Sequence, residues 1–172
     1  YTSDYSKAAI KTIYAGLFNV IAQANMIIKY AEKNGDVIED PAARAVITGE
    51  AYAIRAFCQL DVLRLFGQMP QGASQQVELP YSETTSIDEM PAYYGFDAYV
   101  AKLESDLVKA ESFLKDSDPV FQYTFSNLNS VSGNELNDSY MYYRQARMNY
   151  WAVKAIQARM YLYLGKKEKA YA

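Results

Sequence analysis

The sequence predicts an all-α fold, a bundle of helical hairpins with room for a minor β-hairpin in a loop. Apolar residues recur at three- and four-residue spacing along most of the chain, which is the period of a helix that buries one face. Capping residues, prolines and glycines stand between these stretches, where helices begin and end. Of the 172 residues, 51% are hydrophobic, so the chain can bury a core as one domain over residues 1–172.

Two long helices are predicted in the first part of the chain. The first covers residues 5–33, with Asp4 as its cap and Asn34-Gly35 as a left-handed stop. Its apolar stripe consists of Ile10, Tyr14, Leu17, Ile21, Ala24 and Ile28. The second begins at Asp40-Pro41, because a capping side chain followed by proline at the first helical position is a start signal, and it ends at Gly67.

Residues 71–91 are rich in Ser, Thr and Gln and contain Pro80 and Pro91, which predicts a long surface loop. A third helix is predicted over residues 96–115, with charges opposite its apolar face. That apolar face consists of Phe96, Val100, Leu103, Leu107, Ala110 and Leu114.

The segment of residues 117–139 is predicted to form a minor hairpin or an ordered loop. Phe121, Tyr123 and Phe125 alternate with polar residues there, and a polar turn follows at residues 132–134. A fourth helix, over about residues 142–164, should lie deep in the bundle because it is apolar on two faces. Its two stripes are Trp151, Ala155, Ala158, Leu162 and Val153, Ile156, Met160, Leu164.

Composition argues against several classes of function. Histidine is absent, which removes the commonest general base and transition-metal ligand, and Cys58 is the single cysteine. We therefore predict no catalytic residue, metal site or cofactor, and we interpret Cys58 as a small buried hydrophobe. The net charge of -3 has the wrong sign for a nucleic-acid partner. Every apolar stretch is broken before the roughly 18 to 20 residues of a membrane span.

The charged residues are interpreted as structural. Glu50 and Arg55 lie five positions apart, so on one helix they project about 140° apart and cannot act as a pair. A pair of carboxylates could still perform the acid and base steps of a glycosidase. The nearest cluster is predicted to be a solvated face of the third helix and consists of Asp97, Glu104, Asp106 and Glu111.

Tyrosine is unusually frequent, with 17 residues against a single tryptophan. Its flat apolar face and hydroxyl group suit stacking on sugar rings. Tyrosines on helical stripes are predicted to be core residues: Tyr14, Tyr52, Tyr161 and Tyr163. Aromatic residues in predicted loops are the candidate ligand contacts: Tyr81, Tyr93, Tyr94, Phe121 and Tyr123.

The C-terminal residues 151–170 have a tetratricopeptide-like layout. Ala158 occupies the small packing position, Tyr161 the aromatic position, and Ala170 the small position of a following helix. A half-completed helical hairpin would leave an apolar face uncovered, so we expect the chain to be a fragment of a longer protein.

Several motifs resemble those of SusD-like (RagB-like) proteins. Residues 49–57 (GEAYAIRAF) and 63–70 (LRLFGQMP) resemble the signature helix of this family and its exit turn. Three further stretches agree with the family pattern in the same order, at residues 24–28, 103–110 and 147–155.

The resemblance implies the N-terminal, tetratricopeptide-like portion of an outward-facing outer-membrane lipoprotein. Such a protein would capture an oligosaccharide without catalysis and dock onto a SusC-like TonB-dependent transporter. The chain lacks the lipoprotein cysteine, so any membrane contact would be through a lipid anchor absent from this chain. Two alternatives are a helical-repeat adaptor for proteins or peptides, without sugar binding, and an all-helical carbohydrate-active enzyme.

Overall fold

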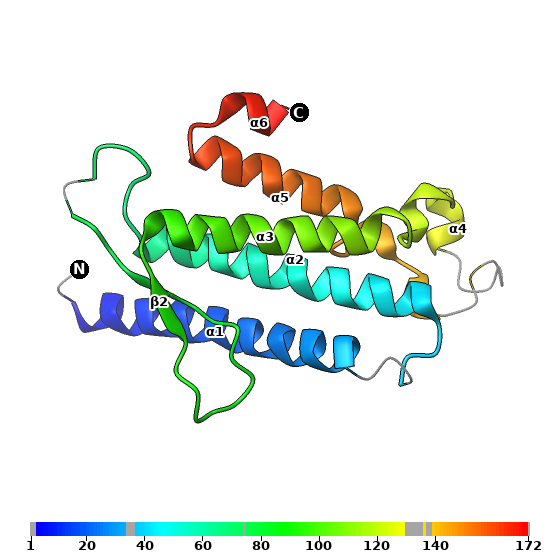
Figure 1. Cartoon of the computed structure of the whole chain (residues 1–172), viewed down its shortest axis with the longest axis horizontal. Coiled ribbons are helices and arrows are strands. Elements are labelled where there is room, and N and C mark those ends of the chain that lie inside the picture. Colours follow the sequence, from blue (N-terminus) through cyan, green and yellow to red (C-terminus); the bar gives the residue numbers. More distant parts are fainter. Residues whose placement is uncertain (1–2, 34–36, 74, 130–135, 137–138, 172) are drawn as a thin grey trace.

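The computed structural model describes residues 3–33, 37–73, 75–129, 136 and 139–171, and it confirms the all-α prediction. Three long helices, α1 (Asp4–Lys33), α2 (Pro41–Phe66) and α3 (Phe96–Lys115), form the body of the molecule, with α2 packed against both others (Figure 1). Helix α5 (Tyr150–Tyr163) packs on α3, and the short α6 (Lys167–Tyr171) folds back onto α5, as the predicted following helix.

The starts of the first two helices are set by local capping. The backbone N–H of Ser6 donates to Ser3 Oγ at 3.2 Å, so Ser3 caps α1 and the prediction of Asp4 as the cap was wrong by one residue. Asp40 caps α2 as predicted, because its Oδ1 accepts from the N–H of Ala42 at 2.9 Å. The predicted stop at Asn34-Gly35 lies outside the described residues.

A small antiparallel hairpin joins α2 to α3, with β1 (Leu79–Tyr81) paired to β2 (Ala92–Tyr94). The prediction of a loop over residues 71–91 was therefore wrong in part, because β1 lies within it and is buried. The hairpin predicted in residues 117–139 is wrong for the part of that segment that the structure describes. That part holds a 3-10 turn, η1 (Pro119–Phe121), and a short helix, α4 (Phe125–Asn129).

Phe121 belongs to a 3-10 turn and not to a strand, although it alternates with polar residues in the sequence. Asp118 caps η1 by accepting from the N–H of Val120 at 3.3 Å, and Pro119 occupies the first position of the turn. The predicted polar turn at Ser132-Gly133-Asn134 lies outside the described residues.

Helix α5 begins at Tyr150 rather than near residue 142. Two 3-10 turns, η3 (Ser139–Met141) and η4 (Arg144–Ala146), precede it, and Tyr143 has a left-handed φ of 59°, which interrupts a helix. The Asn149 side chain then caps α5, accepting from the N–H of Ala152 at 2.9 Å.

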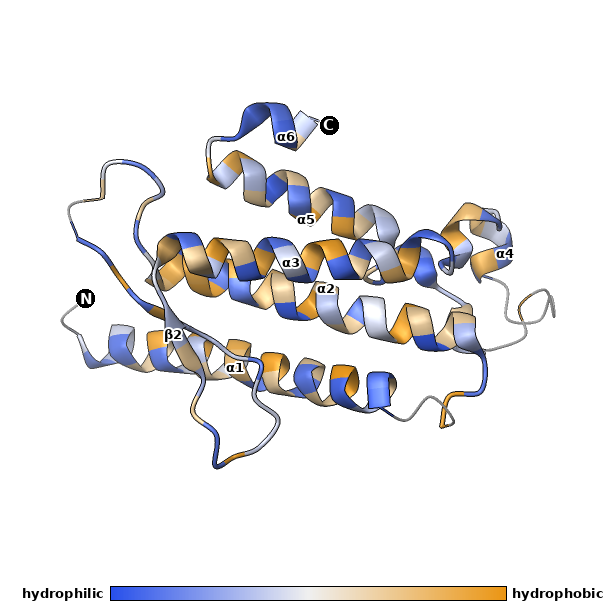
Figure 2. Ribbon diagram, in the orientation of Figure 1, coloured by the Kyte–Doolittle hydropathy of each residue, from blue (hydrophilic) through white to orange (hydrophobic). Residues whose placement is uncertain are grey.

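Helix α5 lies at the edge of the bundle, so its predicted deep position was wrong. One of its stripes is buried, with Val153 and Met160 both 0% exposed, whereas Trp151 and Leu162 on the other stripe are 59% and 61% exposed. Figure 2 shows apolar and hydrophilic residues alternating along the helices, as expected when each buries one face, and a mainly hydrophilic α6.

The core lies where α2 meets α1 and α3, and Ala53, Leu60, Leu103 and Leu107 are all fully buried there. Gly49 allows the close approach of α2 to α3, since a Cβ at this position would lie 2.8 Å from Leu114 Cγ. Of the tyrosines predicted to be core, Tyr52 is buried and the other three are half-buried. Cys58 is buried as predicted, and burial raises the pKa of its thiol to about 11.

Candidate functional site

The five aromatic residues predicted to contact ligand belong to segments that precede and follow α3 in the sequence. Tyr81, Tyr93 and Tyr94 belong to the hairpin that precedes α3, and Phe121 and Tyr123 follow that helix. Helix α3 has 20 residues and is therefore about 30 Å long. The structure does not bring the five residues together into one site.

Tyr81 is a core residue. Its side chain is 2% exposed, its hydroxyl donates to Asp106 Oδ2 at 2.6 Å, and its ring packs edge-on against Tyr99 with centroids 5.1 Å apart. Its ring therefore has no free face on which a sugar could stack, in contrast to the expectation for a loop residue.

A buried polar network surrounds Tyr81 and joins three of the motifs that resemble the SusD-like family. Arg55 donates through Nε and Nη2 to both carboxylate oxygens of Asp106, each at 2.7 Å, and through Nη1 to Asn25 Oδ1 at 2.9 Å. Asn25 in turn donates to the carbonyl oxygens of Ser82 and Thr84, at 3.1 and 3.0 Å. The network fastens the hairpin onto α1, α2 and α3.

Asp106 is 2% exposed, so the prediction that it lies on a solvated face was wrong. Burial would lower the pKa of the Arg55 guanidinium, but the hydrogen bonds and charge of Asp106 outweigh burial, and the pKa lies above its ordinary value. The Arg55 guanidinium therefore stays charged and paired with Asp106, which is a structural arrangement.

Glu50 belongs to a second buried network, and it involves the fourth motif. Its carboxylate accepts from Arg147 Nε and Nη2, at 3.1 and 2.6 Å, and lies 3.1 Å from Arg144 Nη1. Arg144 is fully buried and pairs with Asp118 at 3.1 Å. Glu50 and Arg55 thus have different partners, in agreement with their predicted projection from opposite sides of α2.

One group of aromatic residues with exposed rings lies near the C-terminal end of α3. The rings of Phe121, Tyr150 and Trp151 form a cluster that we call the aromatic patch, with centroid distances of 4.8, 5.7 and 5.2 Å. The rings are tilted at 56° to 88° to one another, so no two of them stack face to face. Phe121 is 44% exposed and Trp151 is 59% exposed, which leaves ring surface open to a ligand.

Sequence reasoning found Phe121 but missed Trp151, which it placed in a buried stripe. The signal was the cap at Asn149, which puts Trp151 in the first turn of α5, next to the segment that follows α3. Tyr123, the other predicted contact after α3, is half-buried.

Polar groups edge the aromatic patch. Glu111 accepts from the Tyr150 hydroxyl at 3.3 Å, from Lys154 Nζ at 3.3 Å and from Gln157 Nε2 at 2.7 Å. Burial would raise the pKa of Glu111, but the hydrogen bond from Gln157 and the charge of Lys154 hold it below its ordinary value. The edge of the patch is therefore an ionised carboxylate with an ammonium and an amide beside it.

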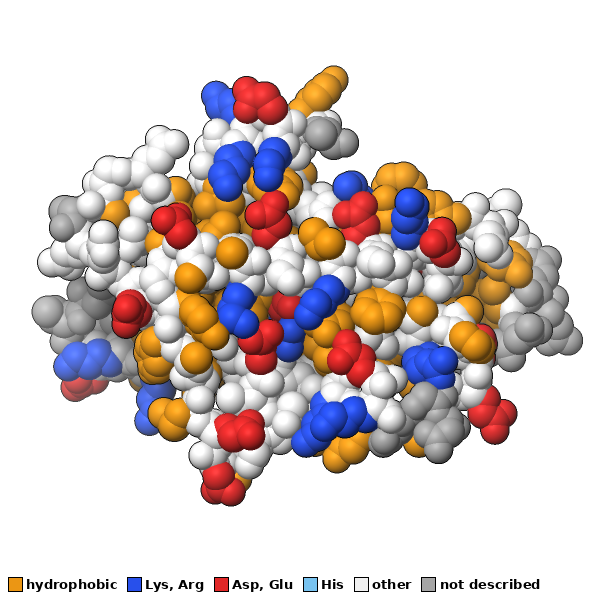
Figure 3. All heavy atoms as spheres, in the orientation of Figure 1, with side chains coloured by type: hydrophobic (Ala, Val, Ile, Leu, Met, Phe, Trp, Pro, Cys, Tyr) orange, Lys and Arg blue, Asp and Glu red, His pale blue; other side chains and the backbone are white. Residues whose placement is uncertain are grey.

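At the other end of α3 the hairpin offers a smaller aromatic surface. Tyr93 is 57% exposed, and Tyr94 is half-buried beneath Lys102, whose Nζ lies 5.1 Å from the ring centroid. Lys102 also pairs with Glu83. Figure 3 shows acidic and basic side chains interspersed over this face of the molecule, without a large area of one sign.

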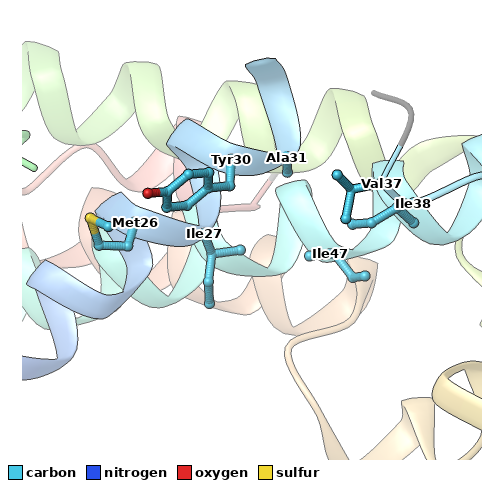
Figure 4. A pocket seen from close by; sticks show the side chains of 7 residues that line it. All are labelled: Met26, Ile27, Tyr30, Ala31, Val37, Ile38 and Ile47. Atoms are coloured by element: carbon cyan, nitrogen blue, oxygen red, sulfur yellow. The ribbon is translucent and has the colours of Figure 1, made fainter. Parts of the chain in front are cut away.

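A groove of about 350 Å³ lies where the end of α1 meets the start of α2 (Figure 4). Its lining is apolar apart from the Tyr30 hydroxyl and consists of Met26, Ile27, Tyr30, Ala31, Val37, Ile38 and Ile47. Such a lining gives few hydrogen-bonding partners to sugar hydroxyls and suits the apolar side chains of another protein segment.

The described residues contain no group of three or more acidic or cysteine side chains placed to hold a metal ion. Within the same ranges, no helix has both the length and the apolar character that crossing a membrane requires.

Comparison of the sequence with family models and with curated proteins found no match. The fold is similar to that of a SusD superfamily protein from Bacteroides thetaiotaomicron, with 22% identity and a TM-score of 0.67 over 92% of this chain and 29% of that chain. It is also similar to a protein assigned as sugar binding from Bacteroides vulgatus, with 21% identity and a TM-score of 0.65 over 92% of this chain and 30% of that one. The chain thus spans less than a third of either structure. It has the fold of part of a SusD superfamily protein, the family that its sequence motifs resemble.

Proposed function

We propose that this chain contributes to the non-enzymatic capture of a glycan at the outer-membrane surface, for delivery to a SusC-like TonB-dependent transporter. The observation that carries the binding role is the aromatic patch, in which Phe121 and Trp151 are exposed beside the Glu111 carboxylate. Apolar sugar faces stack on such rings, and sugar hydroxyls donate to such a carboxylate. The shared fold supports this assignment, and the resemblance in sequence supports surface location and delivery.

The chemistry of the patch favours binding over hydrolysis. A glycosidase needs one carboxyl group that is protonated and acts as a general acid, together with a second carboxylate across the scissile bond. The lowered pKa of Glu111 keeps this group ionised at neutral pH, so it accepts hydrogen bonds and does not donate a proton. Each ring contact contributes only about 0.5 to 1.5 kcal/mol, so we expect modest affinity from this patch.

Isothermal titration of the 172-residue chain against a broad panel of oligosaccharides tests the binding role. At least one member should bind, and Trp151→Ala should weaken that interaction. Tyr171→Ala is the matched control, because Tyr171 is a 96% exposed ring on α6, outside the patch. A folded chain that binds no member of the panel would refute glycan capture by this portion.

The delivery step has a separate test. A SusC-like transporter gene should neighbour the gene for this protein, and the two products should co-purify from the membrane. The alternative function is a helical-repeat adaptor without sugar binding, and the apolar groove of about 350 Å³ is the observation that favours it. A negative glycan panel, combined with loss of a protein partner on Ile27→Asp, would favour the adaptor.

A further inference from the structure

Helix α1 lies along one side of the bundle, and its sides have different surroundings (Figure 1). Ile21 and Ile28 are buried in the core that α1 shares with α2. Asn25 and Lys29 donate hydrogen bonds to residues 82–85, so a second side of α1 carries the hairpin. The remaining side of the helix is exposed.

The exposed side of α1 has a heptad pattern. Its residues recur at alternating spacings of four and three positions, which is the period of a helix that packs along another helix. The β-branched members Ile13, Val20 and Ile27 are 50%, 40% and 42% exposed. We call this side the α1 seam. It consists of seven exposed residues, Ala9, Ile13, Gly16, Val20, Gln23, Ile27 and Tyr30.

The α1 seam carries no charge. Residues 12–28 contain no Asp, Glu, Lys or Arg, whereas charged side chains usually make up roughly a quarter of an exposed surface. At about 100° per residue, the charged residues of α1 all project within an arc of about 100° on the opposite side of the helix. They are Asp4, Lys7, Lys11, Lys29, Glu32 and Lys33. Depletion of charge from an apolar surface is typical of the centre of a protein interface.

We propose that the α1 seam pairs with the α1 seam of a second copy of this chain, across a two-fold axis that passes near Val20. Val20 lies midway between Ile13 and Ile27, so the three β-branched residues align when two seams meet. Most homodimers have two-fold symmetry, in which a surface contacts its own copy. Ala9 and Gly16 are small, and a Cβ added at Gly16 would have nothing within 4 Å, which leaves room for a second helix.

The chemistry of the seam fits a second copy better than a partner of opposite charge. A two-fold axis brings each side chain near its own copy, so a charged side chain close to the axis would be repelled by its counterpart. The α1 seam has none. Its polar groups are the amide of Gln23 and the hydroxyl of Tyr30, and each of them both donates and accepts hydrogen bonds. Such groups can be satisfied between two like surfaces.

The dimensions of the seam predict a weak dimer. It spans residues 9–30, so it is about 32 Å long, and an α-helix with its side chains is about 10 Å wide. Two such strips bury less than the roughly 1,200 Å² at which stable interfaces begin. We therefore expect a dissociation constant on the order of 100 µM. The aromatic patch belongs to η1 and α5, so this inference does not depend on the proposed glycan binding.

Sedimentation equilibrium of the 172-residue chain measures the self-association directly. Between about 5 µM and about 1 mM the mean mass should rise from 19.5 kDa toward twice that value. A chain that stays monomeric at the highest concentration would overturn the proposal, and the seam would then be left for a different protein.

Substitutions at Val20 test whether one seam meets another. Val20→Glu and Val20→Lys should each weaken self-association at least about ten-fold, because each brings two like charges together in the interface. An equimolar mixture of the two variants should associate again, since Glu and Lys then meet across the axis. Val108→Glu is the matched control, because Val108 is 55% exposed on α3, outside the seam. A thermal melt verifies that each variant is folded.

The outcomes are distinct. Association that Val20→Glu leaves unaltered, or that Val108→Glu weakens equally, would place the contact on another surface and overturn the proposal. Loss of association in both Val20 variants without rescue in the mixture would show that α1 meets a different surface of the second copy, which would also overturn it. Rescue in the mixture, with an unaltered control, would support the pairing of two α1 seams.

Discussion

Arg55 and Asp106 form a bidentate ion pair in the interior of the protein, with both nitrogen-to-oxygen distances at 2.7 Å. Their side chains are only 5% and 3% exposed. The pair joins α2 to α3, and the hydrogen bonds of Asn25 and Tyr81 extend it to α1 and to the hairpin. Residues of three separate motifs therefore serve one structural network.

Removing one partner of this pair should be strongly destabilising. Arg55→Ala leaves the Asp106 carboxylate buried without its charge partner, which typically costs about 3 to 5 kcal/mol in the free energy of unfolding. Arg64→Ala is the control on the same helix, because its pair with Asp61 is partly exposed and should contribute less than about 1 kcal/mol. Urea denaturation measures both values, and similar losses in the two variants would contradict the structural role of Arg55.

Gly49 and Gly16 should respond in opposite directions to alanine. At Gly49 a new Cβ would lie 2.8 Å from Leu114 Cγ, 3.0 Å from Phe113 Cβ and 3.2 Å from the Ala110 carbonyl oxygen, so overpacking should cost about 1 to 3 kcal/mol. At Gly16 on α1 nothing lies within 4 Å, so alanine should stabilise the helix by up to about 1 kcal/mol. Thermal melts of both variants test the difference, and a stabilised Gly49→Ala would show that α2 and α3 are not closely packed.

Acid should weaken the attachment of α5 and α6 to α3 through Glu104. The Tyr161 hydroxyl donates to Glu104 at 2.6 Å, and this hydrogen bond, together with the charge of Lys169, holds the pKa of Glu104 below its ordinary value of 4.5. The folded-state pKa is depressed, so the stabilisation is present above pH 4.5 and is lost as pH falls through the lower folded value.

Glu104→Gln should therefore flatten the dependence of the melting temperature on pH below pH 4.5 relative to the unaltered chain. The variant should also be less stable at neutral pH, because the charge of Lys169 loses its partner. If the melting temperatures of the two proteins fall with pH at the same rate across that acidic range, Glu104 is not responsible for the loss of stability in acid.

Replacing Trp151 should affect ligand binding more than stability. Trp151→Ala removes a ring that is 59% exposed, so we expect at least a five-fold loss of glycan affinity, with a loss of stability below about 1 kcal/mol. Leu162→Ala is the control, because Leu162 is 61% exposed on the same helix but lies outside the aromatic patch. Titration and thermal melts on both variants separate the two effects, and equal affinity in both would remove Trp151 from the binding surface.

The sequence by itself determined the long helices, because their signals are local. The cap at Asp40 with Pro41, the interval of residues 96–115 and the burial of Cys58 each follow from neighbouring residues along one helix. The different directions of Glu50 and Arg55 follow in the same way, since the helical period fixes them. These features need no knowledge of which helix packs against which.

Only the tertiary structure decided where the side chains meet. The late start of α5 reflects Arg144 and Arg147, which are held by Asp118 and Glu50 from distant parts of the chain. Asp106 is buried because Arg55, 51 positions away, supplies its charge partner, although its neighbours on α3 indicate a solvated face. Trp151 lies beside Phe121 because α5 packs on α3, and this contact between segments distant in sequence creates the candidate site. Pairing of this kind depends on the mutual satisfaction of buried charges and rings, which no periodicity within one segment encodes.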